Sequence, residues 1–306
     1  MNIRQKSIVT AKITILATTV LWFSACSNAN WLEFRGYQGR GVARASLEPP
    51  LALKWKLPLQ LDGSKATAFN PPIIYKNTIY FGADDGNFYA LNVESGYMRW
   101  IFKTRAPINS VPYADDQAVY FGSNDGSVYA VNRDNGQELW SFQTTSTVQS
   151  LVVRYGDLIM FTSDRDASYF LDLYGNEVHR ISNPIWSYHT FQVYEDVVYW
   201  APGPVDRGVS FGAYDITQHS YLWIVDRSNP YAVWYSFPAL SERTVFYATG
   251  GVRHNGLSFE YLALDRLTGE VLWTVSQESY FGEVPIHNAS QQFYDNLRLL
   301  DYMAPV

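Results

Sequence analysis

The sequence predicts an all-β fold, a β-propeller whose blades are four-stranded antiparallel sheets. One segment recurs about every 40 residues, and each copy contains four strand-like runs separated by turn signals. The composition agrees with this fold, because the 306 residues include 23 Tyr, 17 Phe and 10 Trp, which favour strands and layered sheet packing.

The repeat is clearest in two aligned blocks, NTIYFGADDGNFYALNVESGYMRWIFK from Asn77 and QAVYFGSNDGSVYAVNRDNGQELWSFQ from Gln117. Each block begins with an alternating apolar strand, passes through a DDG or NDG hairpin turn into a second strand, and ends in a third strand that carries a Trp. A short strand precedes each block, PPIIY at 71–75 and SVPYA at 110–114. These four strands define one blade.

Weaker copies follow along the chain. The third unit has His179 where the others have Trp, the fourth lacks the Gly, and the fifth, ALDRLTGEVLW, restores the pattern. A sixth unit begins in VPIHNASQQFYDNLRLLDYM. We expect about six blades, or seven, with LALKWKL at 51–57 as the outer strand of the last blade, because this pairing closes the ring and leaves no free sheet edge.

One motif of eleven residues ends each unit, with a small residue, an Asn or Asp, a Gly and a Trp at fixed places. The Asn or Asp side chain can bond backbone amides ahead of it, and the Gly can adopt a positive φ. The small residue leaves room on one sheet face, so that the Trp can lie flat between blades. The residues of this structural motif are Ala90, Asn92, Gly96 and Trp100, then Ala130, Asn132, Gly136 and Trp140, then Asp215 and Trp223, then Ala263, Asp265, Gly269 and Trp273.

The motif resembles the tryptophan-docking motif of pyrroloquinoline-quinone-type (PQQ-like) propeller repeats, and the resemblance covers residues 71 to about 300. WLEFRGYQGRGV, at 31–42, resembles the segment that opens such propellers. The family includes quinone-dependent dehydrogenases, so an enzyme is the alternative. Those enzymes are longer, and they use a vicinal cysteine disulfide and a bound Ca²⁺.

The chain has one cysteine, the DDG and NDG segments are interpreted as hairpin turns, and the five histidines lack metal-ligand spacing. We therefore predict no catalytic residue, no cofactor and no metal.

The N-terminus is predicted to direct the chain to the cell envelope. A cationic segment precedes an uncharged run, Ile13–Phe23, and then Ser24 and Ala25 precede Cys26. This arrangement resembles the lipobox of bacterial lipoproteins, which implies a signal peptide at 1–25 and lipidation of Cys26. By the sorting pattern of that family, Ser27 implies the outer membrane, facing the periplasm. The remaining chain divides into an anchor segment, 26–50, and a single propeller domain, 51–306.

The predicted partner is a protein of the envelope. The formal charge is −6, and about −9 without the signal, which excludes a nucleic-acid surface. Two connections, 202–211 and 250–259, exceed the tight turns of the first blades, and aromatic connections are expected on the same face. The candidate residues of this face are Trp186, His189, Arg207, Trp234, Tyr235, Arg253 and Phe281.

Two alternatives concern this face. Trp186 and Trp234 could instead fill the ring core, and the propeller could bind a carbohydrate or small ligand. In architecture the chain resembles the lipoprotein propellers of the outer-membrane β-barrel assembly machinery, which implies a non-catalytic scaffold in outer-membrane protein assembly or envelope maintenance.

Overall fold

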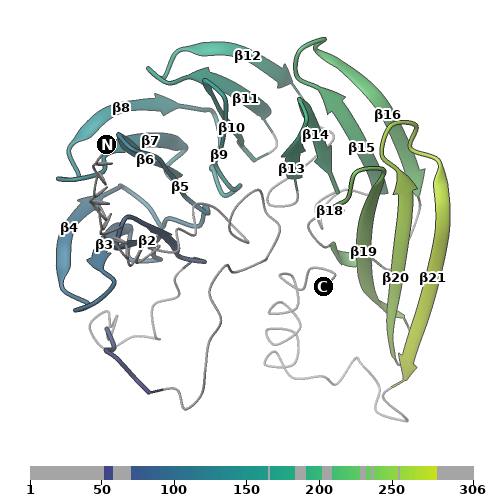
Figure 1. The fold of residues 1–306 in the computed structure, drawn as a ribbon, viewed down its shortest axis with the longest axis horizontal. Helices are drawn as coiled ribbons and strands as arrows, with labels where there is room; N and C mark the ends of the chain where they lie inside the picture. Colours follow the sequence, from purple (N-terminus) through teal and green to yellow (C-terminus); the bar gives the residue numbers. More distant parts are fainter. Residues whose placement is uncertain are drawn as a thin grey trace, which may run out of the picture.

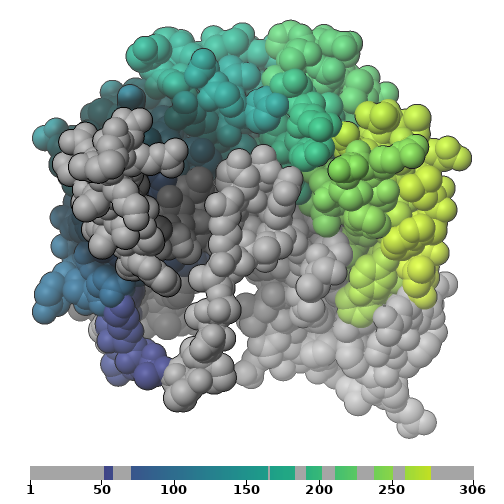
Figure 2. All heavy atoms as spheres, in the orientation of Figure 1, coloured from purple at the N-terminus to yellow at the C-terminus, as the bar shows by residue number. Residues whose placement is uncertain are grey.

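The structure is a computed structural model that describes residues 52–57, 70–164, 166–182, 191–201, 209–227, 232–235, 238–253 and 256–280. Every regular element in these ranges is a β-strand, and no helix there is long and apolar enough to cross a membrane. The strands form five antiparallel sheets that follow one another in chain order around a common centre (Figure 1). In the space-filling view the described residues follow the same order, from purple to yellow (Figure 2). The predicted β-propeller with four-stranded antiparallel blades is confirmed.

The first three blades are regular four-stranded sheets in which consecutive strands are neighbours. Blade 1 consists of β1 (Ile73–Tyr75), β2 (Thr78–Gly82), β3 (Asn87–Asn92) and β4 (Met98–Lys103). Blade 2 consists of β5 (Tyr113–Ala114), β6 (Ala118–Gly122), β7 (Ser127–Asn132) and β8 (Glu138–Gln143). Blade 3 consists of β9 (Val153–Tyr155), β10 (Leu158–Thr162), β11 (Ala167–Asp172) and β12 (Glu177–Ser182).

The last two described blades have longer outer strands. Blade 4 consists of β13 (Phe191–Tyr194), β14 (Val197–Trp200), β15 (Val209–Asp215) and β16 (Ser220–Arg227). Blade 5 consists of β17 (Ala232–Tyr235), β18 (Ala239–Leu240), β19 (Thr244–Arg253), β20 (Gly256–Asp265) and β21 (Val271–Tyr280). Both β17 and β18 pair with β19, and the order then runs to β20 and β21.

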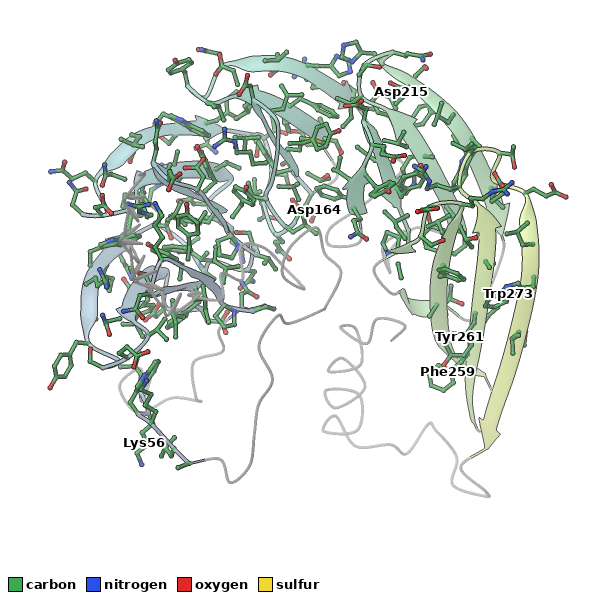
Figure 3. All side chains as sticks on the ribbon, viewed as in Figure 1. Lys56, Asp164, Asp215, Phe259, Tyr261 and Trp273 are labelled. Atoms are coloured by element: carbon green, nitrogen blue, oxygen red, sulfur yellow. The ribbon has the colours of Figure 1, made fainter. Side chains whose placement is uncertain are left out.

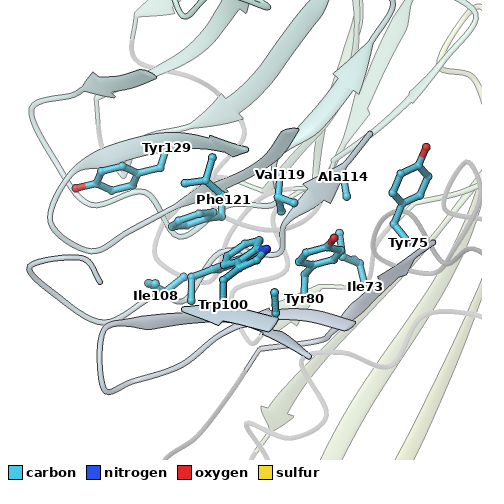
Figure 4. Packing of buried hydrophobic residues seen from close by; sticks show 12 residues of the cluster. Ile73, Tyr75, Tyr80, Trp100, Ile108, Ala114, Val119, Phe121 and Tyr129 are labelled. Carbon is cyan, nitrogen blue, oxygen red and sulfur yellow. The ribbon is translucent and has the colours of Figure 1, made fainter. Parts of the chain in front are cut away.

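Neighbouring blades pack face to face through aromatic and aliphatic side chains. Between blades 1 and 2, Phe88 stacks on Phe121 with ring centroids 4.0 Å apart, and both rings are fully buried. Trp100, Tyr80 and their neighbours fill the rest of this interface (Figure 4). The core is therefore a series of layers between blades, and each blade depends on the next for burial of its apolar face.

Blade 5 corrects one expectation about connections. The sequence predicts a long connection at 250–259, but Gly250 pairs with Phe259 and Arg253 pairs with Gly256. Only residues 254 and 255 lie between the paired strands, because the alternating pattern of this segment continues both strands. Strands β19, β20 and β21 each contain ten residues, and blade 5 projects beyond its neighbours (Figure 1).

The closure of the ring is described in part. Residues 52–57 are not assigned as a strand, but Trp55 packs against the buried Phe81 and Tyr89 of blade 1. The sixth unit predicted in 284–303 lies outside the described residues, as do the signal segment and Cys26. The number of blades beyond these five therefore stays a prediction.

Candidate partner-binding surface

Tryptophans of the repeat link neighbouring blades at all but one of the described junctions. The indole of Trp100, 7% exposed, donates its N–H to the backbone oxygen of Arg133 in blade 2 over 2.8 Å. The same ring covers Gly136, where an added Cβ would come within 2.7 Å of the ring. Gly136 has a φ of +74°, so the position requires glycine for both space and conformation.

Three further junctions share this geometry. In each, an indole N–H donates to a backbone oxygen and the ring covers a glycine of positive φ in the following turn. The donor, acceptor and glycine are Trp55, Val93 and Gly96, then Trp140, Leu173 and Gly175, then Trp223, Arg266 and Gly269, with donor–acceptor distances of 2.7, 2.9 and 2.9 Å.

The Asn, Asp and Ala residues of the repeat motif also make the contacts that the sequence predicts. The side-chain oxygen of Asn92 accepts the amides of Glu94 and Ser95, and Asn132, Asp215 and Asp265 accept equivalent pairs of amides. Ala90, Ala130 and Ala263 are fully buried and stand opposite Trp100, Trp140 and Trp273. The Asn and Asp side chains therefore shape the turns, and the alanines leave room beside the Trp in the next strand.

The junction between blades 3 and 4 differs from the others. His179 occupies the Trp position, and its ring lies 4.2 Å from the ring of His219, centroid to centroid. His219 takes the place of the glycine in the blade 4 turn and keeps a positive φ of 51°. His179 Nε2 forms a 3.0 Å hydrogen bond with the buried Tyr214 hydroxyl. The pKa of His179 is lowered by burial and by the neighbouring His219.

The Asp carboxylates of the hairpin turns accept hydrogen bonds from nearby groups of the protein. Asp125 accepts the hydroxyl of Tyr129 over 2.8 Å and the amide of Ser127 over 3.0 Å. Burial alone would raise the pKa of this carboxyl, but these hydrogen bonds outweigh burial and the pKa is lowered. Equivalent Tyr–Asp pairs join Asp85 to Tyr89 and Asp166 to Tyr169. In the described ranges no three His, Cys, Asp or Glu side chains come together as a metal site.

Two arginines contact residues of the preceding blade. The sequence pattern does not mark either of them as a functional residue. The backbone oxygen of Arg266 accepts the Trp223 indole, and its guanidinium bonds Glu195 over 2.7 Å and Tyr199 over 3.3 Å in blade 4. Arg133 stands in the same place in blade 2, within 5.6 Å of the Tyr75 ring in blade 1. Burial and a hydrogen bond to Asp116 raise the pKa of that Tyr75 to about 12.

The outer edge of blade 5 exposes a strand with little charge. β21 is the last strand of its sheet, and β20 is its partner among the described strands. Its first half exposes apolar side chains, with Leu272 at 51%, Trp273 at 46% and Val275 at 55%. Trp273 lies on β21, and Phe259 and Tyr261 lie on the neighbouring β20 (Figure 3). Trp273 therefore leaves about half of its surface accessible, whereas Trp100 is almost fully buried.

The described ranges contain part of the predicted partner face. Trp234 and Tyr235 belong to β17, where they pair with Gly250 and Thr249, and Arg253 ends β19. Trp186, His189, Arg207 and Phe281 lie outside the described residues. The structure thus brings Trp234, Tyr235 and Arg253 onto adjacent strands of blade 5, and the grouping of the full set stays a prediction.

Comparison with protein families identifies the repeat. The PQQ_2 family model, described as Outer membrane protein assembly factor BamB, matches residues 37–172. The chain has the PQQ-like β-propeller fold. The match covers blades 1 and 2 and most of blade 3, where the PQQ-like repeat is most regular. No curated protein matches the sequence significantly.

Solved structures share this PQQ-like propeller fold at low sequence identity. BamB from Moraxella catarrhalis has a TM-score of 0.51 and 15% identity, over 65% of this chain and 61% of that one. The quinohemoprotein alcohol dehydrogenase ADHIIG from Pseudomonas putida HK5 has a TM-score of 0.56 and 15% identity, over 81% of this chain and 48% of that one. The computationally designed Ika8 protein has a TM-score of 0.55 and 17% identity, over 71% and 64%.

These likenesses concern the fold. The chain spans about three fifths of the BamB structure it matches and about half of the dehydrogenase. Because the same propeller occurs in an assembly factor and in enzymes, the fold does not distinguish between them.

Proposed function

We propose that this chain is a non-catalytic scaffold of the cell envelope, anchored by a lipid on Cys26, whose blade 5 binds an extended segment of another envelope protein. The match of residues 37–172 to the BamB family supports a scaffold role, and the lipobox-like segment before Cys26 supports the outer membrane as its place, facing the periplasm. The observation that carries the proposal is the exposed, weakly charged edge of β21.

The edge of β21 differs from the other outer strands in length and charge. The outer strands of blades 1–3 contain six residues each and carry charges, such as Arg99 and Lys103 in β4 and Glu177 and Arg180 in β12. Short length and edge charges block pairing with other chains. β21 contains ten residues, and Glu278 is its one charged residue. An extended peptide could therefore add to this edge through backbone hydrogen bonds.

The side chains at this edge favour an apolar partner segment. Trp273 and Val275 are both about half exposed, and exposed aromatic residues commonly anchor protein interfaces. A partner strand with alternating apolar residues would cover them. The accessible half of the Trp273 ring would then be buried as the rings of the other docking tryptophans are.

Photo-crosslinking in cells tests this surface with a matched control. A photoreactive residue replaces Leu272 or, in a second strain, Leu139, which stands at the same repeat position and is equally exposed at 51%. We expect crosslinking of one outer-membrane assembly or envelope protein from position 272 and none from 139. The Val275→Lys substitution should abolish that crosslink. Equal capture from 272 and 139 would contradict a partner surface on blade 5.

The alternative function is that of a quinoprotein dehydrogenase, whose fold this chain shares over 81% of its length. The purified chain is incubated with pyrroloquinoline quinone and Ca²⁺, and oxidation of alcohols and sugars is measured with an artificial electron acceptor. We expect no turnover above that of the free cofactor. Sustained turnover would replace the scaffold proposal with the enzyme.

A further inference from the structure

At the contact between His179 and His219, both residues differ from the repeat. A His replaces the Trp, and a second His replaces the Gly that the Trp would cover. Trp100, Trp140 and Trp223 each cover a glycine, whereas at this junction a smaller imidazole meets a second imidazole in the glycine position. His219 keeps the positive φ of the glycines, although a side chain there is strained. The junction thus has two titratable rings, a partly buried His179 and an exposed His219, where the other junctions have an indole and a glycine.

The hydrogen bond across the junction has also changed. The indoles of Trp100, Trp140 and Trp223 each have an N–H that is always a donor and bonds a backbone oxygen of the next blade. His179 Nε2 instead shares a hydrogen bond with Tyr214, where either group could donate. Protonation of His179 fixes this nitrogen as a donor and places a charge on the ring. The indole N–H at the other junctions, in contrast, keeps its proton and stays neutral.

The charged and titratable groups around the pair come from both blades. On β12, Glu177 lies near His179 and pairs with Arg180 at 3.5 Å. On blade 4, Tyr214 contacts His179, Asp215 lies near His219, and Tyr221 packs against Tyr214. Glu177 favours the charged form of His179, but burial and the second imidazole oppose it. Two imidazolium rings at 4.2 Å would repel each other across the blade boundary.

We propose that the His179–His219 contact is a proton-sensitive junction that loosens the packing of blade 4 against blade 3 when the surroundings become acidic. The junction separates blades 1–3, which contain most of the match to the BamB family, from blades 4 and 5. Blade 5 carries the exposed β21 edge. Loosening here changes how blade 5 is held relative to blades 1–3. This device is independent of the partner proposed for β21.

A metal ion is a less suitable occupant of the pair. In the described part of the chain no third His, Cys, Asp or Glu joins His179 and His219 in a metal-binding group. The Nε2 atom of His179 is already engaged by Tyr214. The pair therefore lacks the ligand number that a structural zinc site requires.

The test compares the full chain with the His179→Trp/His219→Gly double variant, which installs the residues of the other junctions. Melting temperatures are measured at pH 7.5 and pH 5.5, a window in which histidines titrate and ordinary carboxyls do not. We expect the wild type to lose several degrees more than the double variant between these two values. An equal loss in both proteins would overturn the proposal.

A second measurement does not depend on the folding of the variant. The imidazole signals of His179 and His219 in the wild type are titrated by NMR, with each signal assigned from a single substitution. We expect His179 to titrate below the ordinary histidine value of about 6.5, and hydrogen exchange at the blade 3–4 boundary to rise on its titration, with blades 1 and 2 unaffected. A His179 that titrates at or above 6.5, or uniform exchange across all blades, would contradict the proposal.

Discussion

The indole of Trp100 lies so close over Gly136 that a Cβ on this glycine would come within 2.7 Å of the ring. The two residues belong to consecutive blades, and the φ of +74° at Gly136 adds a second restriction on the residue type. A residue other than glycine at position 136 would therefore meet two obstacles, the nearby indole and the positive φ. Substitutions at Gly136 and at a second glycine can separate their costs.

Substitution of Gly136 by Ala should destabilise the protein by about 2–5 kcal/mol. A left-handed conformation costs an L-residue about 1–2 kcal/mol, and overpacking adds about 1–3 kcal/mol. Gly156 provides the control, because it has a φ of +58° and no atom within 4 Å of its would-be Cβ. Gly156→Ala should show the conformational cost alone. Urea denaturation measures both, and equal losses would show that the indole moves aside at no cost.

The two docking tryptophans at blades 1 and 5 should differ in their contribution to stability. Trp100→Ala should raise the fraction unfolded by removing a buried ring, at a cost of about 3–5 kcal/mol. Trp273 is 46% exposed, so Trp273→Ala should cost roughly half as much. Both variants are compared by urea denaturation. A Trp273 variant as unstable as the Trp100 variant would mean that this ring is covered in solution.

The hydroxyl of Tyr129 should stabilise the fold in a pH-dependent way. Tyr129→Phe removes a 2.8 Å hydrogen bond to the carboxylate of Asp125, whose side chain is buried, and this should cost about 1–2 kcal/mol at pH 7. The pKa of Asp125 is lowered in the folded state, so its contribution is fully present above its unfolded pKa of about 3.8 and is lost as the pH falls through the lower folded pKa. The Tyr129→Phe loss should therefore shrink towards pH 3.

The exposed Tyr97 provides the control for this experiment. Its side chain is 79% exposed, so Tyr97→Phe should leave stability unchanged at both pH values. Guanidinium titrations at pH 7 and pH 3 measure the two variants. A Tyr129 effect that is the same at both values would show that Asp125 does not take part in it.

Most of the blade architecture is readable from the sequence because it is locally encoded. Asn92, Gly96 and Trp100 lie within nine residues, and the turn they form depends on side-chain hydrogen bonds to nearby amides and on one positive φ. The hairpin from Arg253 to Gly256 could also be predicted from the sequence. Asn255–Gly256 is a strong hairpin signal, and it lies inside the segment expected to be a long connection.

Other features depend on positions with no local signal. The sequence marks His179 as a departure from Trp, but its partner His219 lies 40 residues later in a turn without glycine. Arg266 follows the turn Asp in blade 5, and Arg133 follows the turn Asn in blade 2. The other described units have Val93, Leu173 and Ile216 at this place, so the repeat alone does not mark an arginine there. Its role appears once blade 4 places Glu195 and Tyr199 beside it.

The lipid anchor is the prediction on which the placement of the protein depends. Cys26 is the one cysteine of the chain, and it directly follows Ser24 and Ala25 at the end of an uncharged run. Cys26→Ala should abolish labelling by a radioactive fatty acid and release the propeller from the membrane fraction, because stable attachment requires multiple acyl chains. Ser27→Ala, at the neighbouring position, should leave labelling intact. Labelling and membrane association that persist in the Cys26 variant would remove the anchor and, with it, the argument for the outer membrane.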